Sequence, residues 1–154
     1  MKPKKYKLVE YKASNIRGYN GHKIIVEESF VPKLDTVNRL AIKHNVTVWV
    51  TNSTRIGEVK LTGTIVTPAD MSNHKVGHAI DMNVQCNKTG EWFNTAKMRD
   101  GKGVDNAFLI EVDLDSQLRW GGRFNRKDEV HIDDGLNILN PTMYREIYNQ
   151  IQAA

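Results

Sequence analysis

The residues with the clearest chemical potential are a histidine and an aspartate seven positions apart, His74 and Asp81. Apolar residues at 80, 82 and 84 alternate with polar residues at 81 and 83, which predicts a β-strand over residues 78–84. In that strand Asp81 points to the face opposite Ile80 and Met82. Aspartate is unfavourable in the middle of a strand, so Asp81 must be exposed or paired. A metal ion shared with His74 is one partner that would stabilise it.

A second histidine, His78, lies four residues after His74. On a helix, that spacing would place both rings on one face, as one type of zinc peptidase requires. Here Lys75 stands where such a motif has glutamate, and Gly77 interrupts the segment. Strand alternation instead places His78 on the face of Ile80, so we expect a packed structural histidine.

Two motifs occur in a fixed order along the chain. The segment SNHKVGHAID, from Ser72 to Asp81, fits the pattern S-x-H-x-x-G-x-A-x-D at all five fixed positions. Farther on, a Trp-Gly-Gly turn at residues 120–122 precedes Asp128-Glu129-Val130-His131. Over about residues 30–131, the chain resembles the zinc D-Ala-D-Ala carboxypeptidase and L-alanyl-D-glutamate peptidase family, which includes phage endolysins.

This resemblance implies one zinc ion held by His74, Asp81 and His131. Three protein ligands leave a fourth position open, as in catalytic zinc sites. The resemblance also assigns the catalytic base to Asp128, three residues before the last ligand. Glu129 is the alternative, because in an extended segment 129–132 it would share a face with His131.

The family also carries an arginine after the strand that precedes the first motif, and Arg55 occupies that place. The residue before it is usually glycine or aromatic in the family, whereas this chain has Thr54. Arg55 would stabilise the developing oxyanion or hold a substrate carboxylate, for which its planar fork is suited. Ser72 would either hydrogen-bond the substrate or shape the turn.

Hydrophobic periodicity predicts the elements that position these residues. The pattern is helical from Ser29 to Asn45 and over residues 104–118, and Asn140-Pro141 begins a final helix. Strands are expected at 22–26, 46–51, 78–84 and 129–132, a short irregular strand or loop at 58–67, and a long surface loop at 87–102. This mixture has no βαβ regularity, which favours an α+β fold. The resemblance implies a small, mainly antiparallel sheet flanked by helices, with the zinc cleft on the sheet, as in hedgehog and DD-peptidase domains.

Composition sets further bounds. The chain has 154 residues, which suits a single zinc peptidase domain spanning 1–154. Its one cysteine, Cys86, cannot form an internal disulfide. No apolar run approaches the roughly 18–20 residues that span a bilayer, so stable membrane insertion is not expected. The formal net charge of +4 would favour an acidic cell-wall polymer, although a merely solvated surface explains it better.

We therefore expect a zinc metallopeptidase that hydrolyses the stem peptides of bacterial peptidoglycan, of the L-alanyl-D-glutamate endopeptidase type found in phage endolysins. The alternatives are a D-Ala-D-Ala carboxypeptidase and a non-catalytic zinc module that binds the wall. No nucleic-acid partner is expected, because no aromatic and basic recognition module is evident. We expect a monomer, made in the host cytoplasm without a signal peptide and active on the wall after release.

Overall fold

The computed structural model describes residues 4–56, 71–101 and 103–152. Its main sheet has the strand order β2 (Ile16–Gly18), β4 (Val46–Asn52), β5 (Ala79–Cys86), β8 (His131–Asp133) and β7 (Arg119–Trp120), and β6 (Trp92–Phe93) pairs with β5. Among the strand pairs of the described residues in this sheet, β2–β4 is parallel and the others are antiparallel. A separate antiparallel pair joins β1 (Leu8–Tyr11) to β3 (Ile24–Glu27). The expected α+β class and the mainly antiparallel sheet are confirmed.

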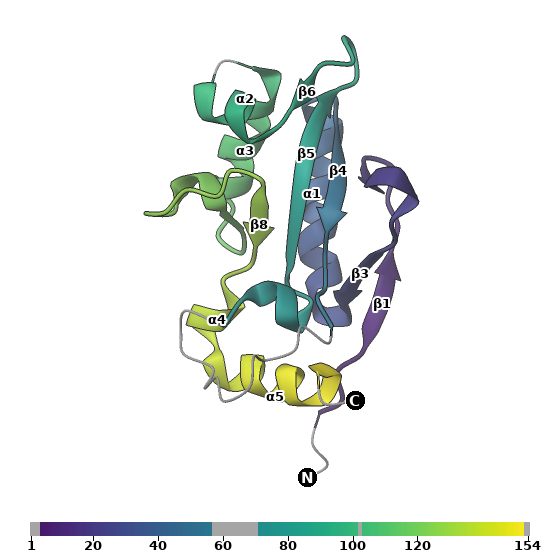
Figure 1. The fold of residues 1–154 in the computed structure, drawn as a ribbon, viewed down its shortest axis with the longest axis vertical. Coiled ribbons are helices and arrows are strands. Elements are labelled where there is room, and N and C mark those ends of the chain that lie inside the picture. Colours follow the sequence, from purple (N-terminus) through teal and green to yellow (C-terminus); the bar gives the residue numbers. More distant parts are fainter. Residues whose placement is uncertain (1–3, 57–70, 102, 153–154) are drawn as a thin grey trace.

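One face of the sheet is buried under a helix. In β4, Val46, Val48 and Val50 are buried and point toward α1 (Val31–Lys43). Figure 1 shows α1 behind β4 and β5, so their other face is turned toward the viewer. The helix ends where expected, because Asn45 has a φ of 54°, a left-handed conformation that asparagine tolerates.

The prediction of a long surface loop at 87–102 is wrong in part. Within it lie the short strand β6 and the helix α2 (Thr95–Asp100). The side chain of Asn94 caps α2 by accepting a hydrogen bond from the Lys97 amide. Phe93 and Met98 are buried in the core and tie this polar segment down. With so few apolar residues, neither element has a visible period in the sequence.

Other elements occur where predicted, with shifted bounds. The helix expected at 104–118 is α3 (Val104–Leu114), and it ends at Asp115, whose side chain accepts a hydrogen bond from the Gln117 amide. The strand expected at 129–132 begins only at His131, because residues 129 and 130 form a turn. The strand or loop expected at 58–67 lies outside the described residues.

The C-terminal part packs against the first motif rather than against the sheet. The helix α4 (Leu136–Leu139) leads into α5 (Pro141–Gln152), and Asn140 caps α5 by accepting from the Met143 amide. The buried face of α5, with Tyr144 and Ile147, forms a small second core with Val76. Within the part of the chain that the structure describes, no helix is long and apolar enough to cross a membrane.

A buried ion network joins three elements behind the first motif. The His78 ring is 1% exposed, with Nδ1 2.6 Å from an Asp134 carboxylate oxygen and Nε2 2.9 Å from a Glu27 oxygen. Lys33 on α1 donates to the same Asp134 carboxylate. Burial opposes all of these charges, but the mutual hydrogen bonds outweigh it. They raise the pKa of His78 and lower the pKa of Glu27 and Asp134. His78 is therefore the packed structural histidine that the alternation predicts.

Replacing His78 should destabilise the fold. In His78→Leu, two buried carboxylates lose their shared cation, which typically costs about 3–5 kcal/mol of unfolding free energy. Thermal unfolding in chelator, with the exposed His22→Leu as control, measures this loss. The difference from wild type should be greatest at mildly acidic pH, between the ordinary pKa values of carboxyl groups and of histidine. It should shrink as the pH falls through the lowered pKa values of Glu27 and Asp134, and also as the pH rises from the ordinary histidine pKa through the raised pKa of His78. An unchanged melting temperature would contradict this role.

Candidate metal centre

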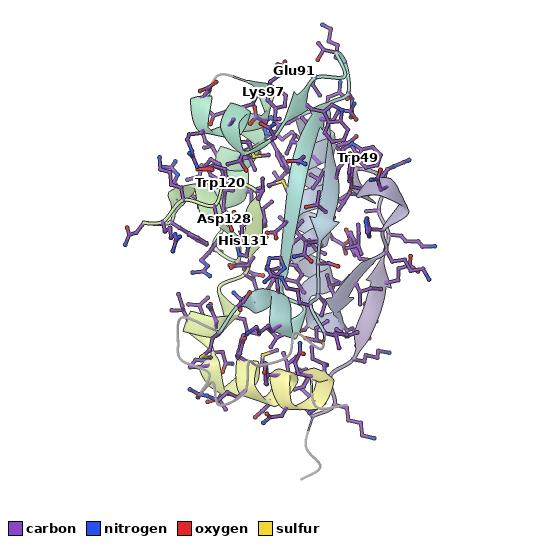
Figure 2. All side chains as sticks on the ribbon, viewed as in Figure 1. Trp49, Glu91, Lys97, Trp120, Asp128 and His131 are labelled. Atoms are coloured by element: carbon purple, nitrogen blue, oxygen red, sulfur yellow. The ribbon has the colours of Figure 1, made fainter. Side chains whose placement is uncertain are left out.

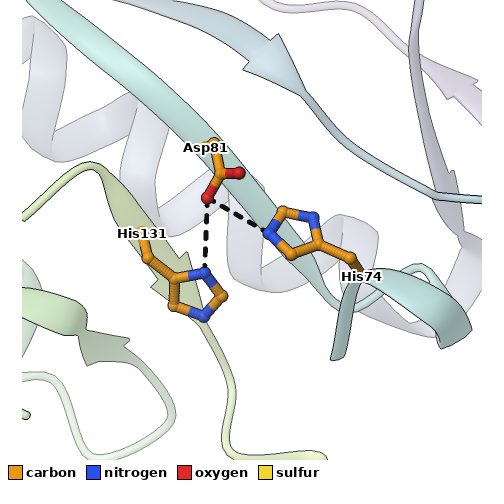
Figure 3. A group of neighbouring side chains, drawn as sticks. All are labelled: His74, Asp81 and His131. Atoms are coloured by element: carbon orange, nitrogen blue, oxygen red, sulfur yellow. Dashed lines mark hydrogen bonds and ion pairs between the residues drawn. The ribbon is translucent and has the colours of Figure 1, made fainter. Parts of the chain in front are cut away.

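Two imidazole rings and a carboxylate converge on the open face of the sheet. His74 Nε2 lies 3.1 Å, and His131 Nδ1 3.4 Å, from the same oxygen, Asp81 Oδ1. One ligand atom from each of these residues lies within 4.8 Å of the others, which makes them a group that could hold a metal ion. Figure 3 shows both rings directed at the Asp81 carboxylate. The structure thus brings together the three residues predicted as zinc ligands.

Local backbone geometry explains the fixed positions of the first motif. Ser72 Oγ accepts from the His74 amide and caps η4 (Asn73–Val76), the short 3-10 helix that carries His74. Gly77 then takes a φ of +72°, and a Cβ there would lie 2.4 Å from the Glu27 amide nitrogen. Only glycine fits this reversal of the chain against β3. The strand β5 starts directly after it, with the buried Ala79. Two residues later Asp81 returns to the open face.

Each histidine is held from behind through its other ring nitrogen. His74 Nδ1–H donates to the Ser53 carbonyl at 2.7 Å, and His131 Nε2–H donates to an Asp133 carboxylate oxygen at 2.6 Å. Both bonds keep the outward proton in place, so the inward nitrogen is the one that presents a lone pair when a metal displaces its proton. The donor set, with both tautomers fixed, therefore fits a divalent ion such as zinc.

Asp133 supports His131 from behind, and the motifs did not reveal it. Arg119 donates two hydrogen bonds to its carboxylate, at 2.7 and 2.9 Å, and so fixes the group that orients His131. The sequence contained one signal for this role: Asp133 lies two residues after the last ligand, and residues two apart in a strand share a face.

The charges of the centre stabilise one another. Burial would raise the pKa of Asp81, but hydrogen bonds from His131 and His74 hold it well below its usual range. Burial would lower the pKa of His131, but bonds to Asp133 and Asp81 raise it to about 9. Without a metal, a proton therefore occupies His131 at neutral pH, and an incoming metal ion must displace it.

The second motif positions Asp128 beside this centre. The Asp128 amide donates to the Gly121 carbonyl at 2.9 Å, and the Asp128 carbonyl accepts from the His131 amide at 3.0 Å. A Cβ at Gly121 would lie 2.1 Å from the Asp128 carbonyl oxygen, which explains the glycine of the Trp-Gly-Gly turn. Figure 2 shows Asp128 next to His131. Loss of water around its carboxyl group raises the pKa of Asp128, although the residue as a whole is exposed.

Glu129, the alternative base, is turned elsewhere. Its buried carboxylate accepts two hydrogen bonds from Arg99 on α2, at 3.2 and 3.0 Å, and this guanidinium lowers its pKa. Glu129 would share a face with His131 only if the segment between them were extended. In the structure Glu129 lies in a turn.

Arg55 lies beside the proposed metal ligands. Its Nη2 is 3.9 Å from Asp81 Oδ2, and its amide donates to the His74 carbonyl at 3.0 Å. Thr54, where the family usually has glycine or an aromatic residue, is fastened to β3 by donating its amide and hydroxyl to the Ile25 carbonyl. Ser72 shapes the turn through its cap, and a substrate contact from its hydroxyl stays a prediction.

Comparison with known proteins agrees with this geometry. Residues 66–134 match the family model described as D-alanyl-D-alanine carboxypeptidase. The matched segment includes His74, Asp81, Asp128 and His131, and it confirms the expected resemblance to the zinc D-Ala-D-Ala carboxypeptidase family. Arg55 and the earlier residues of the expected range lie outside it. None of the curated proteins compared with the chain matches it.

Metal affinity should depend on the orienting carboxylate as well as on the ligands. Alanine at His74, Asp81 or His131 should abolish zinc binding in a calorimetric titration. Asp133→Asn should keep the fold but weaken zinc binding about 10–100-fold, because the neutral amide holds the His131 tautomer less firmly. The exposed Asp100→Asn is the matched control. Wild-type affinity in Asp133→Asn would refute the orienting role.

Proposed function

Because the segment that carries the metal centre resembles the D-alanyl-D-alanine carboxypeptidase family, we propose that this protein is a zinc metallopeptidase of the peptidoglycan stem peptide. We further propose an L-alanyl-D-glutamate endopeptidase of the phage endolysin type, active on the cell wall after release from the host cytoplasm. The observation that carries the proposal is the convergence of His74, Asp81 and His131 with both histidine tautomers fixed. Peptidases of this kind hydrolyse amide bonds with a metal and one proton-transferring group.

The ligand set suits hydrolysis. When bound, zinc supplies Lewis acidity for the scissile carbonyl and makes water acidic enough to attack at neutral pH. His74 and His131 are neutral ligands, so the Asp81 carboxylate cancels only part of the metal's charge. Three protein ligands would leave a fourth position for water or substrate.

Two further side chains have roles in the proposed reaction. Asp128 accepts a proton from the attacking water and passes it to the leaving amine, as a general acid–base must. Arg55, next to Asp81, stabilises the negative charge that develops on the carbonyl oxygen or holds a substrate carboxylate. Glu129 is unsuited to the proton transfer because Arg99 occupies both of its carboxylate oxygens.

The alternative activity is a D-Ala-D-Ala carboxypeptidase, which the description of the matched family favours. A carboxypeptidase must bind the terminal carboxylate of its substrate, and Arg55 could supply that contact. The two activities release different fragments from the same stem peptide.

Digestion of purified peptidoglycan tests the function. The zinc-loaded protein should reduce the turbidity of a wall suspension, and a chelator should stop the reaction. Mass spectrometry of the products then distinguishes a cut between L-alanine and D-glutamate from loss of a terminal D-alanine. Zinc binding without any released fragment would instead indicate a module that binds the wall without cutting it.

The base assignment has its own test. Asp128→Ala should bind zinc like wild type but lose about 10²–10⁴-fold in kcat, because the proton transfer is lost. Asp100→Ala, which removes an exposed acid on α2, is the matched control and should stay active. A fully active Asp128→Ala protein would contradict the assignment, and Glu129→Gln would then be the variant to measure.

A further inference from the structure

Three aromatic side chains gather on the sheet surface away from the metal centre. The Trp92 ring centroid lies 5.9 Å from that of Trp49 and 5.9 Å from that of Tyr19. Trp92 and Tyr19 are 39% and 40% exposed, and neither belongs to a hydrophobic core cluster of the described residues. We call these three residues the aromatic platform. Large exposed rings that the core does not require commonly mark a binding surface.

The platform and the metal centre share one face of the sheet. Alternation along β5 places Asp81, Asn83 and Gln85 on the same side, opposite the buried Met82 and Val84. Trp49 is in register with Asn83, and Trp92 with Gln85. At about 3.4 Å per residue, these two paired positions lie roughly 7 and 14 Å along the strand from Asp81. Figure 2 places Trp49 along the same strands, away from His131.

The rings are held in place before any ligand arrives. Trp49 Nε1 donates to the Gln85 side-chain oxygen at 3.0 Å, and Trp92 is fixed because its neighbour Phe93 is buried on the opposite side of β6. Tyr19 lies in a tight turn that needs Gly18, where a Cβ would lie 1.6 Å from the His22 carbonyl oxygen. A prearranged surface loses little conformational entropy on binding.

The chemistry of this surface suits a carbohydrate. Sugar rings present C–H faces that stack on aromatic rings, and hydroxyl or acetamido groups that pair with amides. Asn83, half-buried between the platform and Asp81, has no hydrogen-bond partner for its side chain among the described residues. The charges beside Trp92 neutralise each other, since Lys97 pairs with Glu91 at 3.1 Å.

We propose that the aromatic platform binds the glycan strand of peptidoglycan and directs the attached stem peptide along β5 to the metal centre. This proposal rests on the proposed function and specifies how its substrate is held. An extended peptide advances about 3.3–3.6 Å per residue, so the separation corresponds to roughly two to four residues. The platform therefore favours a bond near the sugar over the distant end of the stem.

Binding of glycan strands freed of their peptides tests the platform directly. The zinc-loaded wild-type protein should bind them saturably in a calorimetric or tryptophan-fluorescence titration. Trp92→Ala and Tyr19→Ala should each weaken binding on the order of tenfold. Trp92→Phe, which keeps a ring, should retain most of the affinity. Leu139→Ala removes a side chain that is 74% exposed on α4, far from β6 in Figure 1, and should bind like wild type.

Kinetics provide a second readout. Trp92→Ala should hydrolyse a soluble stem peptide without sugar at the wild-type rate, while its rate on intact wall falls on the order of tenfold. Equal loss on both substrates would overturn the proposal, because it would indicate general damage to the fold or the centre.

Two other results would also overturn the platform's assignment. The first is wild-type protein that does not bind the glycan strands, or Trp92→Ala that binds them equally well. The second is preferential, Trp92-dependent binding of a single-stranded oligonucleotide, which Arg17 in register with Trp49 could support. If wild-type protein cleaves no stem peptide, the proposed function fails, while the glycan titration still decides the platform.

Discussion

The metal centre depends on hydrogen bonds behind its two histidines. An imidazole ring can bind a metal only through a nitrogen that has no proton, so its other nitrogen must keep one. The Ser53 carbonyl and the Asp133 carboxylate hold those protons on the outward side of His74 and His131. Arg119 in turn holds Asp133. The common direction of the two inward nitrogens toward Asp81 follows from this support.

The same side-chain chemistry gives a different result a few residues away. His78 also contacts carboxylates through both ring nitrogens, but it is 1% exposed and does not belong to the group of described residues that could hold a metal ion. It is a buried cation between Glu27 and Asp134, and it ties β3 to the segment after β8. One histidine of the motif therefore supports the fold, while the other faces the Asp81 carboxylate.

Two close backbone approaches set where the centre can form. Gly77 lies against β3 at the start of β5, and Gly121 lies against the carbonyl of Asp128 before β8. These contacts place Asp81 and His131 opposite each other in neighbouring antiparallel strands. Alternation along β5 places Asp81 on the same face of the sheet as Asn83 and Gln85, the register partners of Trp49 and Trp92.

Periodicity in the sequence predicted the α+β class and the packed His78, because both follow from local alternation. His74, Asp81 and His131 were predicted as ligands through the resemblance of two motifs to a known family. The sequence also placed α1 and α5 closely, since a cap, a proline and an apolar period are read from neighbouring residues. Only the tertiary structure showed that Asp128 is better placed than Glu129 to act as the base. The carboxylate of Glu129 is bound by Arg99, which lies thirty residues earlier in the chain. The same holds for the Arg119–Asp133 support and for the gathering of Tyr19, Trp49 and Trp92. Contacts between distant segments arise from strand pairing and leave no period in the sequence.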